Sequence, residues 1–459
     1  MNVFVRWRPL VGTEIQEGSV DHTTIATTIA TTNSASTKRP LVAVSVNRSL
    51  TPSDKPWKSF AAFDAVLDAS DSNGAAYTTI VQPAVPQVMA GSCCSFFAYG
   101  HSGSGKTHTV IGYENQESSG LGLCLAAAHQ LFIEIERVNE LRDEYGGKET
   151  PLAIGLSVFE LRQKAAFDLL NKGTKCHIRE GPDGKVHIRG ETETLSEGRV
   201  RVQPIVKRPC WSFDELRSEL SAALARRAVG TSSVHDQSSR THAVLELEII
   251  NEQLVSARAE LLDRQSELVP VGKRAMDVTV AEQTKGVLQD ADGNYRPRPG
   301  YVINQALLDE VEAEKAKFEA RVVEAEAKIE AVYAKYNNTA SDCLGGKMVF
   351  VDLAGAEYQQ DGNKTATKPS SKVQTAAEKK EARQINTDLL ALKGVMRAWA
   401  TQQKRVPYRS SPLTMVLRET FMDARNCGSG MVVTVSPAKS DYAATLNSLK
   451  YGSLMGTAR

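Results

Sequence analysis

The sequence predicts an α/β fold with a central, mostly parallel or mixed β-sheet that helices cover on both faces. Short apolar or alternating runs, which are typical of strands, recur along the chain, and stretches with apolar residues at helical spacing separate many of them. The chain has 459 residues, of which 41% are hydrophobic, so it is long enough for one large α/β domain with insertions.

Each element is predicted from its own pattern. Alternating or continuous apolar runs predict strands at Asn2–Val5, Lys58–Val66, Cys93–Tyr99, Leu152–Phe159, His242–Ile250, Lys347–Asp352 and Met431–Ser436. Helical spacing predicts helices at Tyr77–Met89, Ser212–Ala228, Arg383–Ala400, Leu413–Phe421 and Tyr442–Tyr451. Residues 21–37 are rich in Thr, Ser and Ala, and we interpret them as a surface loop that is partly extended.

One segment, residues 251–345, interrupts this alternation with a composition dominated by Glu, Ala, Lys and Arg. Its second half carries a heptad-like seam of Leu308, Val311, Phe318, Val322, Ala325, Ile329 and Val332. A shorter seam precedes it at Leu254, Ala257, Leu261 and Leu268. We expect an antiparallel helical hairpin whose two helices are joined by residues 269–303. A solvated single helix or a partly disordered insertion is the alternative.

Charge and cysteine content exclude several classes of protein. Lys and Arg number 55 against 54 Asp and Glu, so an anionic partner must meet a local basic face rather than the whole molecule. No run of residues is long and apolar enough for a membrane span, and we expect no membrane association. The seven cysteines form no CxxC pair, which suits a reducing compartment, the cytosol or the nucleus.

A glycine-rich loop follows the apolar run Cys93–Tyr99. Residues 100–107 read Gly-His-Ser-Gly-Ser-Gly-Lys-Thr and match the GxxxxGK[ST] phosphate-binding loop. In such a loop the backbone N–H groups hold phosphate oxygens, the lysine (Lys106) reaches the β- and γ-phosphates, and the hydroxyl of Thr107 binds Mg²⁺. The sequence therefore predicts a nucleoside triphosphate site.

Further polar residues suit the same site. Asp352 ends an apolar strand and is a candidate for the metal's water shell, and the Gly355 N–H is placed to sense a γ-phosphate. Ser238, Ser239 and Arg240 precede another strand, and Glu357 is a natural ionic partner for Arg240. Neither Asn-Lys pair in the chain is followed by the aspartate of a guanine-reading motif, so we expect ATP.

Taken together, these motifs resemble the kinesin motor domain along nearly the whole chain outside residues 251–345. Phe97–Thr109 is similar to the kinesin phosphate loop, Ser238–His242 to switch I (SSRSH) and Asp352–Glu357 to switch II (DLAGSE). Other matching segments are Arg6-Trp-Arg-Pro9, Ile385–Leu392, Val406-Pro-Tyr-Arg409 with Leu413-Thr414, Ser436-Pro437 and Thr445–Tyr451. The order of these motifs is highly specific.

The resemblance implies a role for each matching position. It places Ser238, Ser239, Arg240, Gly355 and Glu357 in catalysis and Thr107, Ser239 and Asp352 around Mg²⁺. ATP would contact Arg6, Arg8, Pro9, Gly100, His101, Ser102, Gly103, Ser104, Gly105, Lys106, Thr107 and His108. Arg240 and Glu357 would close as a latch on the γ-phosphate, and Gly355 would release switch II after hydrolysis.

The resemblance also implies a track, the microtubule, and the segment 361–409 is strongly basic. Lys393, Arg397, Lys404, Arg405 and Arg409 are the candidate contacts with the acidic microtubule surface. No zinc pattern, RNA-binding aromatic signature or helix-turn-helix spacing accompanies this charge, so we expect no nucleic acid partner.

Several positions depart from the family pattern. His235 stands where switch I usually has Asn, Thr241 replaces a Ser, and Ala356 replaces the Ser of switch II. Ser410 and Pro412 stand where an Asp and a Lys are usual. These changes leave the phosphate chemistry intact and bear instead on hydrolysis rate and track affinity.

We therefore predict an Mg²⁺-dependent, microtubule-stimulated ATPase associated with the cytoskeleton. A non-catalytic tubulin-binding scaffold and a cytosolic P-loop ATPase with a helical partner arm are the alternatives. The segments Leu389–Lys393 and Thr445–Leu449 also resemble the microtubule-depolymerising kinesins, whose Lys-Val-Asp loop motif is absent from this sequence. These motifs leave the oligomeric state and the direction of movement open.

Overall fold

A computed structural model describes most of the chain. The described residues are 1–27, 41–47, 56–112, 120–144, 150–181, 184–227, 240–289, 294–336, 343–355, 376–423 and 428–457. Among the helices of these residues, none combines the length and the apolar character that a membrane crossing requires.

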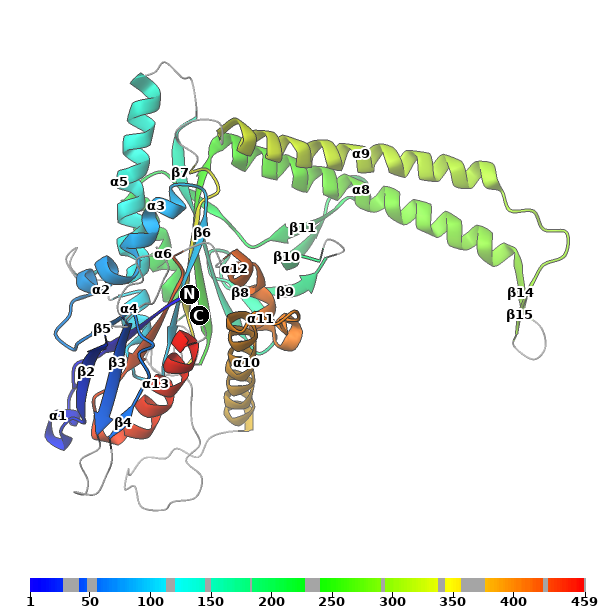
Figure 1. The fold of residues 1–459 in the computed structure, drawn as a ribbon. Helices are drawn as coiled ribbons and strands as arrows, with labels where there is room; N and C mark the ends of the chain where they lie inside the picture. Colours follow the sequence, from blue (N-terminus) through cyan, green and yellow to red (C-terminus); the bar gives the residue numbers. More distant parts are fainter. Residues whose placement is uncertain are drawn as a thin grey trace, which may run out of the picture.

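A twelve-stranded mixed sheet forms the middle of the molecule (Figure 1). Its strands are β1 (Asn2–Trp7), β5 (Ala65–Leu67), β6 (Cys93–Tyr99), β7 (Leu152–Arg162), β8 (Ala165–Asp168), β9 (Thr174–Glu180), β10 (Val186–Thr194), β11 (Val200–Pro204), β12 (Arg208–Cys210), β13 (His242–Asn251), β16 (Lys347–Asp352) and β17 (Gly430–Val435). The order is β11-β10-β9-β8-β7-β13-β16-β6-β17-β1-β5, with β12 beside β7. Strands β16, β6, β17, β1 and β5 pair in parallel. The pairings from β16 through β13 to β11 are antiparallel, so the expected mixed sheet is confirmed.

Helices cover both faces of this sheet, as predicted. The helices of the compact body are α1 (Glu14–Glu17), α2 (Asn73–Ile80), α3 (Val85–Val88), α4 (Lys106–Val110), α5 (Leu123–Glu144), α6 (Phe213–Arg227), α10 (Ala376–Ala400), α11 (Pro412–Val416), α12 (Arg418–Asp423) and α13 (Tyr442–Thr457). In β1, Phe4 packs into the core that α2, α3, α5 and α6 complete. The alternating Val3 and Val5 pack into a second core with α10 and α13. This period of two is what a sheet with two buried faces requires.

Three predicted elements are interrupted. Lys58–Val66 was expected to be one strand, but β4 (Trp57–Lys58) and β5 are separate, and Phe60 between them is exposed. Pro83 and Pro86 lack a backbone N–H, so the helix expected over 77–89 divides into α2, a 3₁₀ turn and α3. The helix expected over 413–421 divides into α11 and α12.

The segment 21–37, which we expected to be a partly extended loop, begins with a strand. Residues Asp21–Thr27 form β2, which pairs with β3 (Leu41–Asn47) in a small separate sheet that β4 completes. Residues 28–37 lie outside the described part of the chain.

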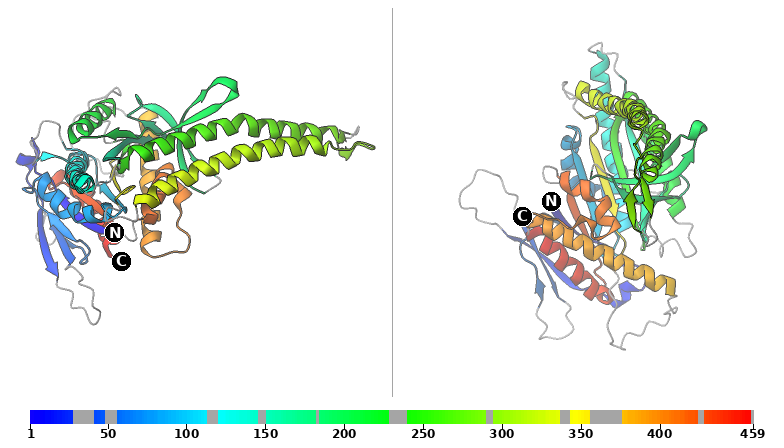
Figure 2. Two further views of the ribbon diagram at one scale, coloured as in Figure 1. Left: turned by 90° about the horizontal axis from the view of Figure 1, so that it is seen from above. Right: turned by 90° about the vertical axis from the view of Figure 1, so that its right-hand side faces the viewer.

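The expected helical hairpin is present and projects far from the body (Figures 1 and 2). Helix α8 (Glu252–Lys285) leads outward and α9 (Gln305–Tyr336) returns, and we call residues 252–336 the arm. The predicted boundary of the first helix was wrong, because α8 continues through Pro270 for a further fifteen residues. A short ribbon of β14 (Val287–Gln289) and β15 (Tyr295–Pro297) lies at the distal end.

At the base of the arm the predicted seams join the core of the body, which contains Leu254 and against which Ile329 and Val332 pack. Leu254, Val311 and Ala325 are buried, and the other predicted seam positions are at least partly covered. Ion pairs join the helices beside the seam: Arg274 with Glu314, Arg321 with Glu267 and Lys328 with Glu260. These pairs confirm an antiparallel hairpin in which residue numbers on the two helices run in opposite directions.

Buried charges attach the arm to the sheet. The carboxylate of Glu248, on β13, is fully buried and accepts hydrogen bonds from Arg258 on α8 at 2.7 and 3.1 Å. Arg258 also donates to the hydroxyl of Tyr333 on α9 at 2.8 Å, and Lys207 reaches Glu248 from the segment before β12. Burial by itself raises the pKa of Glu248, but Lys207, Lys347 and Arg258 outweigh it and hold that pKa below its usual range.

Candidate functional site

The ends of four parallel strands meet at one edge of the large sheet. The loop at 100–105 follows β6, the turn at 353–355 follows β16, Ser436 follows β17, and Arg8 follows β1. Strand β13 is antiparallel to β16 and therefore begins at this same edge, with His242. Such an edge of an α/β sheet is a common place for ligand binding.

The glycine-rich loop has a backbone that only glycine adopts readily. Gly103 and Gly105 have φ of +76° and +95°. At Gly100 a Cβ atom would lie 2.3 Å from the carbonyl oxygen of Thr434, so the loop packs directly against β17. The hydroxyls of Ser104 and Thr434 are 2.7 Å apart and strengthen this attachment. The loop is therefore held in place by a neighbouring strand.

The lysine of the loop is buried inside it. The Nζ atom of Lys106 donates to the carbonyl oxygens of Gly100 at 3.1 Å and His101 at 2.8 Å. His101 is buried as well, and its Nδ1–H donates to the carbonyl of Ser102 at 2.7 Å. Burial lowers the pKa of His101, which leaves its ring neutral and Lys106 as the cation of the loop.

Asp352 connects the loop to the rest of the site. Its Oδ2 atom accepts from the hydroxyl of Thr107 at 2.8 Å and from Nη1 of Arg227 at 2.9 Å. Arg227 further donates to the carbonyl oxygen of Thr241 at 3.0 Å. The Oδ1 atom of Asp352 is buried and finds no partner within the described ranges. A carboxylate oxygen without a partner beside a hydroxyl is a donor set that suits Mg²⁺ and its water shell.

The turn after β16 lies against the glycine-rich loop. A Cβ atom on Gly355 would approach the backbone nitrogen of Ser102 to 2.8 Å, so this position has room for glycine alone. Of the other predicted switch residues, Arg240 lies in a turn two residues before β13 begins. Ser238, Ser239 and Glu357 lie outside the described residues, and so the predicted latch between Arg240 and Glu357 stays a prediction.

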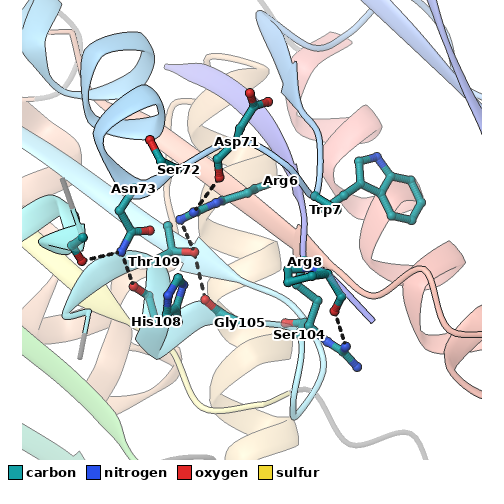
Figure 3. A pocket seen from close by; sticks show the side chains of 13 residues that line it. Arg6, Trp7, Arg8, Asp71, Ser72, Asn73, Ser104, Gly105, His108 and Thr109 are labelled. Carbon is teal, nitrogen blue, oxygen red and sulfur yellow. Dashed lines mark hydrogen bonds between the residues drawn. The ribbon is translucent and has the colours of Figure 1, made fainter. Parts of the chain in front are cut away.

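A pocket of about 530 Å³ opens beside the loop (Figure 3). Its walls include Arg6, Arg8 and Pro9, predicted as nucleotide contacts, together with Ser104, Gly105 and His108 from the loop and α4. Trp7 lies between Arg6 and Arg8 in the sequence. Its buried ring stacks on the ring of His22, with 3.9 Å between the two ring centres. Arg8 is held by Glu14, with two nitrogen–oxygen distances of 2.7 Å.

Several residues of the site were missed by the sequence reasoning. Two of them are partners of the predicted Arg6, which donates to the hydroxyl of Thr109 at 3.0 Å and to the carbonyl of Asp71 at 3.4 Å. Asn73, on the first turn of α2, donates to the carbonyl of His108 at 3.2 Å and also lines the pocket. Arg227 ends α6 and has no motif of its own; its only signal is the Arg226–Arg227 pair just before the switch I segment.

The five predicted microtubule contacts differ in their surroundings. Arg397, Lys404, Arg405 and Arg409 are exposed on and after α10. Arg409 forms a bidentate pair with Glu180 of β9 at 2.7 and 2.8 Å. Lys393 is half-buried, with its ammonium 4.9 Å from the ring centre of Tyr451 on α13. Lys404, Arg405 and Arg409 line a groove of about 580 Å³ with Arg418.

A buried carboxylate in α10 gives a pH prediction. Burial raises the pKa of Asp388 to about 6, although Gln384 and Ser411 donate hydrogen bonds to it. A raised folded-state pKa means that this group stabilises the fold at low pH and that the benefit is lost as pH rises from about 4 to 6. We expect Asp388→Asn to raise the free energy of unfolding at pH 7.5 by about 2 kcal/mol and to have little effect at pH 4. Urea unfolding at both pH values measures this, with exposed Asp277→Asn as the control; equal effects at the two pH values would contradict it.

The fold and this site define a P-loop protein of the α/β class. The model of the family described as "Kinesin motor domain" matches residues 6–272 and 326–457. The chain belongs to the kinesin motor-domain family. The unmatched residues between the two ranges form the distal part of the arm.

Two curated relatives show the same similarity. The chain is 26% identical over 389 residues to kinesin-like protein KIN-13B of Arabidopsis thaliana, covering 85% of this chain and 39% of the relative. It is also 26% identical over 389 residues to kinesin-like protein KIN-13A of Oryza sativa subsp. japonica, where it covers 34% of the relative. The chain therefore spans little more than a third of the length of these proteins.

Proposed function

We propose that this chain binds ATP with Mg²⁺, hydrolyses it, and couples the cycle to microtubule binding. Membership of the kinesin motor-domain family supports an ATPase of this kind. The observation that carries the proposal is Asp352, which joins Thr107 of the glycine-rich loop to the strand that leads into the switch II turn. A change at the phosphates can therefore reach that turn through a single side chain.

The residues of the site suit a nucleoside triphosphate. The pocket between Arg6 and His108 has room for a base and sugar, and the loop amides and the Lys106 ammonium would hold phosphates. Thr107 and Asp352, with the predicted Ser239, would hold the metal. Bound Mg²⁺ would neutralise charge on the β- and γ-phosphates.

The track contact rests on charge. Arg397, Lys404, Arg405 and Arg409 form an exposed basic surface around α10 and the segment that follows it. An acidic surface such as that of the microtubule is its natural complement, and its contribution should weaken as salt screens the charges.

The test is the steady-state ATPase rate of this chain with and without stabilised microtubules. We expect microtubules to stimulate turnover, and we expect Lys106→Ala to abolish it, because that change removes the cation that meets the phosphates. The matched control is Lys404→Ala, which should retain basal turnover and weaken the dependence on microtubules.

Other outcomes separate the alternatives. Microtubule binding without turnover would favour a scaffold, and turnover without microtubule binding would favour an ATPase with a helical partner arm. Shortening of microtubules in the presence of ATP, followed by light microscopy, would favour the depolymerising activity that the segments Leu389–Lys393 and Thr445–Leu449 suggest.

A further inference from the structure

His242 makes a contact that none of the predicted roles uses. It begins β13 and is almost completely buried. Its Nδ1 atom accepts a hydrogen bond at 3.1 Å from the backbone N–H of Ala354, which follows β16. Burial, together with the nearby charges of Arg227 and Lys106, lowers the pKa of His242 to about 3, so the ring is neutral and free to accept this bond at physiological pH.

The bonded amide lies in the turn that touches the glycine-rich loop. Ala354 is buried and immediately precedes Gly355, whose Cα lies so close to Ser102 that no Cβ fits between them. The other end of the turn is fixed by the Leu353 N–H, which donates to the carbonyl of Ala98 at 3.4 Å. His242 therefore supports the turn from the side of β13, opposite the phosphate-binding loop.

We propose that His242 is a positioning residue. Its Nδ1 atom sets the distance between the turn 353–355 and the phosphate-binding loop. The inference rests on the proposed function, because it gives this turn the task of meeting the nucleotide. One nitrogen of the ring, Nδ1, holds the turn. Since Nδ1 accepts, the neutral ring carries its proton on Nε2, and this buried atom has no partner among the residues that the structure describes.

Three substitutions separate this role from space filling. His242→Asn keeps an acceptor close to the position of Nδ1, His242→Gln places its amide near the position of Nε2, and His242→Phe keeps the ring volume without either nitrogen. If volume alone matters, Phe should be tolerated best and Asn worst. If the Nδ1 contact matters, Asn should be tolerated best. Val244→Ala serves as the control, because it opens a cavity at the next position on the same face of β13.

Hydrogen–deuterium exchange of a peptide that contains Ala354 measures the protection of its N–H by His242. The ATPase rate measures the effect of this contact on turnover. We expect the Gln and Phe variants to exchange faster by ~10-fold or more, since a lost hydrogen bond opens the amide to solvent. Their kcat should fall by ~10-fold or more with little change in nucleotide affinity, because the turn would be misplaced while the loop is intact. The Asn variant and the Val244→Ala control should stay within ~3-fold of wild type in exchange and in kcat.

An order that follows side-chain volume, with Phe closest to wild type, would overturn the proposal. So would wild-type exchange in the Phe variant, which would show that the ring does not protect the amide. Exchange does not depend on turnover. A wild-type chain without ATPase activity would therefore reject the proposed function, while the order of the three variants in exchange would still decide the role of His242.

Discussion

Replacing Asp352 by Asn is expected to lower the free energy of unfolding by about 3–5 kcal/mol and to abolish Mg²⁺-dependent ATP turnover. The stability loss follows because Arg227 and Asp352 are both buried, with 4% and 0% of their side chains exposed. Removing the carboxylate charge breaks a buried ion pair whose two members lie 2.9 Å apart, and breaking such a pair costs more than the pair itself contributes. Urea unfolding without nucleotide measures the stability, and ATPase rates over a range of Mg²⁺ concentrations measure the metal dependence.

A second substitution tests the cause. Combining Asp352→Asn with Arg227→Met removes both charges, so the double variant should recover at least half of the lost stability, while its ATPase activity should not return. Thr107→Val removes only the hydroxyl that donates to Asp352 and should cost about 1 kcal/mol. Additive losses from the two charge changes would contradict the buried pair.

The glycine-rich loop was predictable because its chemistry is local. Spacing alone places Lys106 and Thr107 after Gly105, and the preceding apolar run identifies the strand that delivers them. Asp352 ends a predicted strand, and Arg8 follows another. Because parallel strands place their carboxyl ends at one edge of a sheet, the sequence predicts that both residues lie near this loop. Lys347–Asp352 is a strand with the predicted bounds, so Asp352 lies at the edge where the loop begins.

Contacts that depend on how helices pack could not be read in this way. Arg227 looks like any surface residue at a helix end, and only the position of α6 on the sheet directs it to Asp352. The charge of Lys393 predicts its place in the basic surface, but not the contact of its ammonium with the ring of Tyr451 at 4.9 Å. The first helix of the hairpin is predicted to end before residue 269, yet α8 continues through Pro270, where α9 packs along it and compensates for the lost backbone hydrogen bond.

The arm is attached more firmly than a surface insertion needs to be. Asn251 ends β13 and caps α8 by accepting the N–H of Leu254, so the strand passes directly into the helix. Beyond the buried Glu248, the β11 strand supports the next turns of α8 through an ion pair between Arg201 and Asp263. The Cβ atom of Pro270 lies within 3.8 Å of a Cβ placed on Gly198. The arm therefore has a base that the body supports as far as Pro270 and a distal part beyond that residue, in which the ion pair between Arg274 and Glu314 joins the two helices of the arm.

This division predicts opposite results for two changes in the arm. Replacing residues 273–315 by a short Gly/Ser linker should leave the melting temperature within about 2 °C and nucleotide binding unchanged, because adjacent helices are only about 8–10 Å apart and the linker spans that gap.

Arg258→Met should lower the free energy of unfolding by about 2–4 kcal/mol, since it leaves the buried Glu248 carboxylate with fewer donors, although Lys207 remains. Thermal unfolding and a fluorescent-nucleotide titration measure both. Arg274→Met, whose partner Glu314 is half-exposed, is the matched control for an ion pair of the distal part. Arg274→Met should lower the free energy of unfolding by less than about 1 kcal/mol. Equal losses of stability from the two arginine variants would show that the base is no more firmly held than the distal part. Loss of nucleotide binding in the shortened arm would instead place its distal part within the motor core.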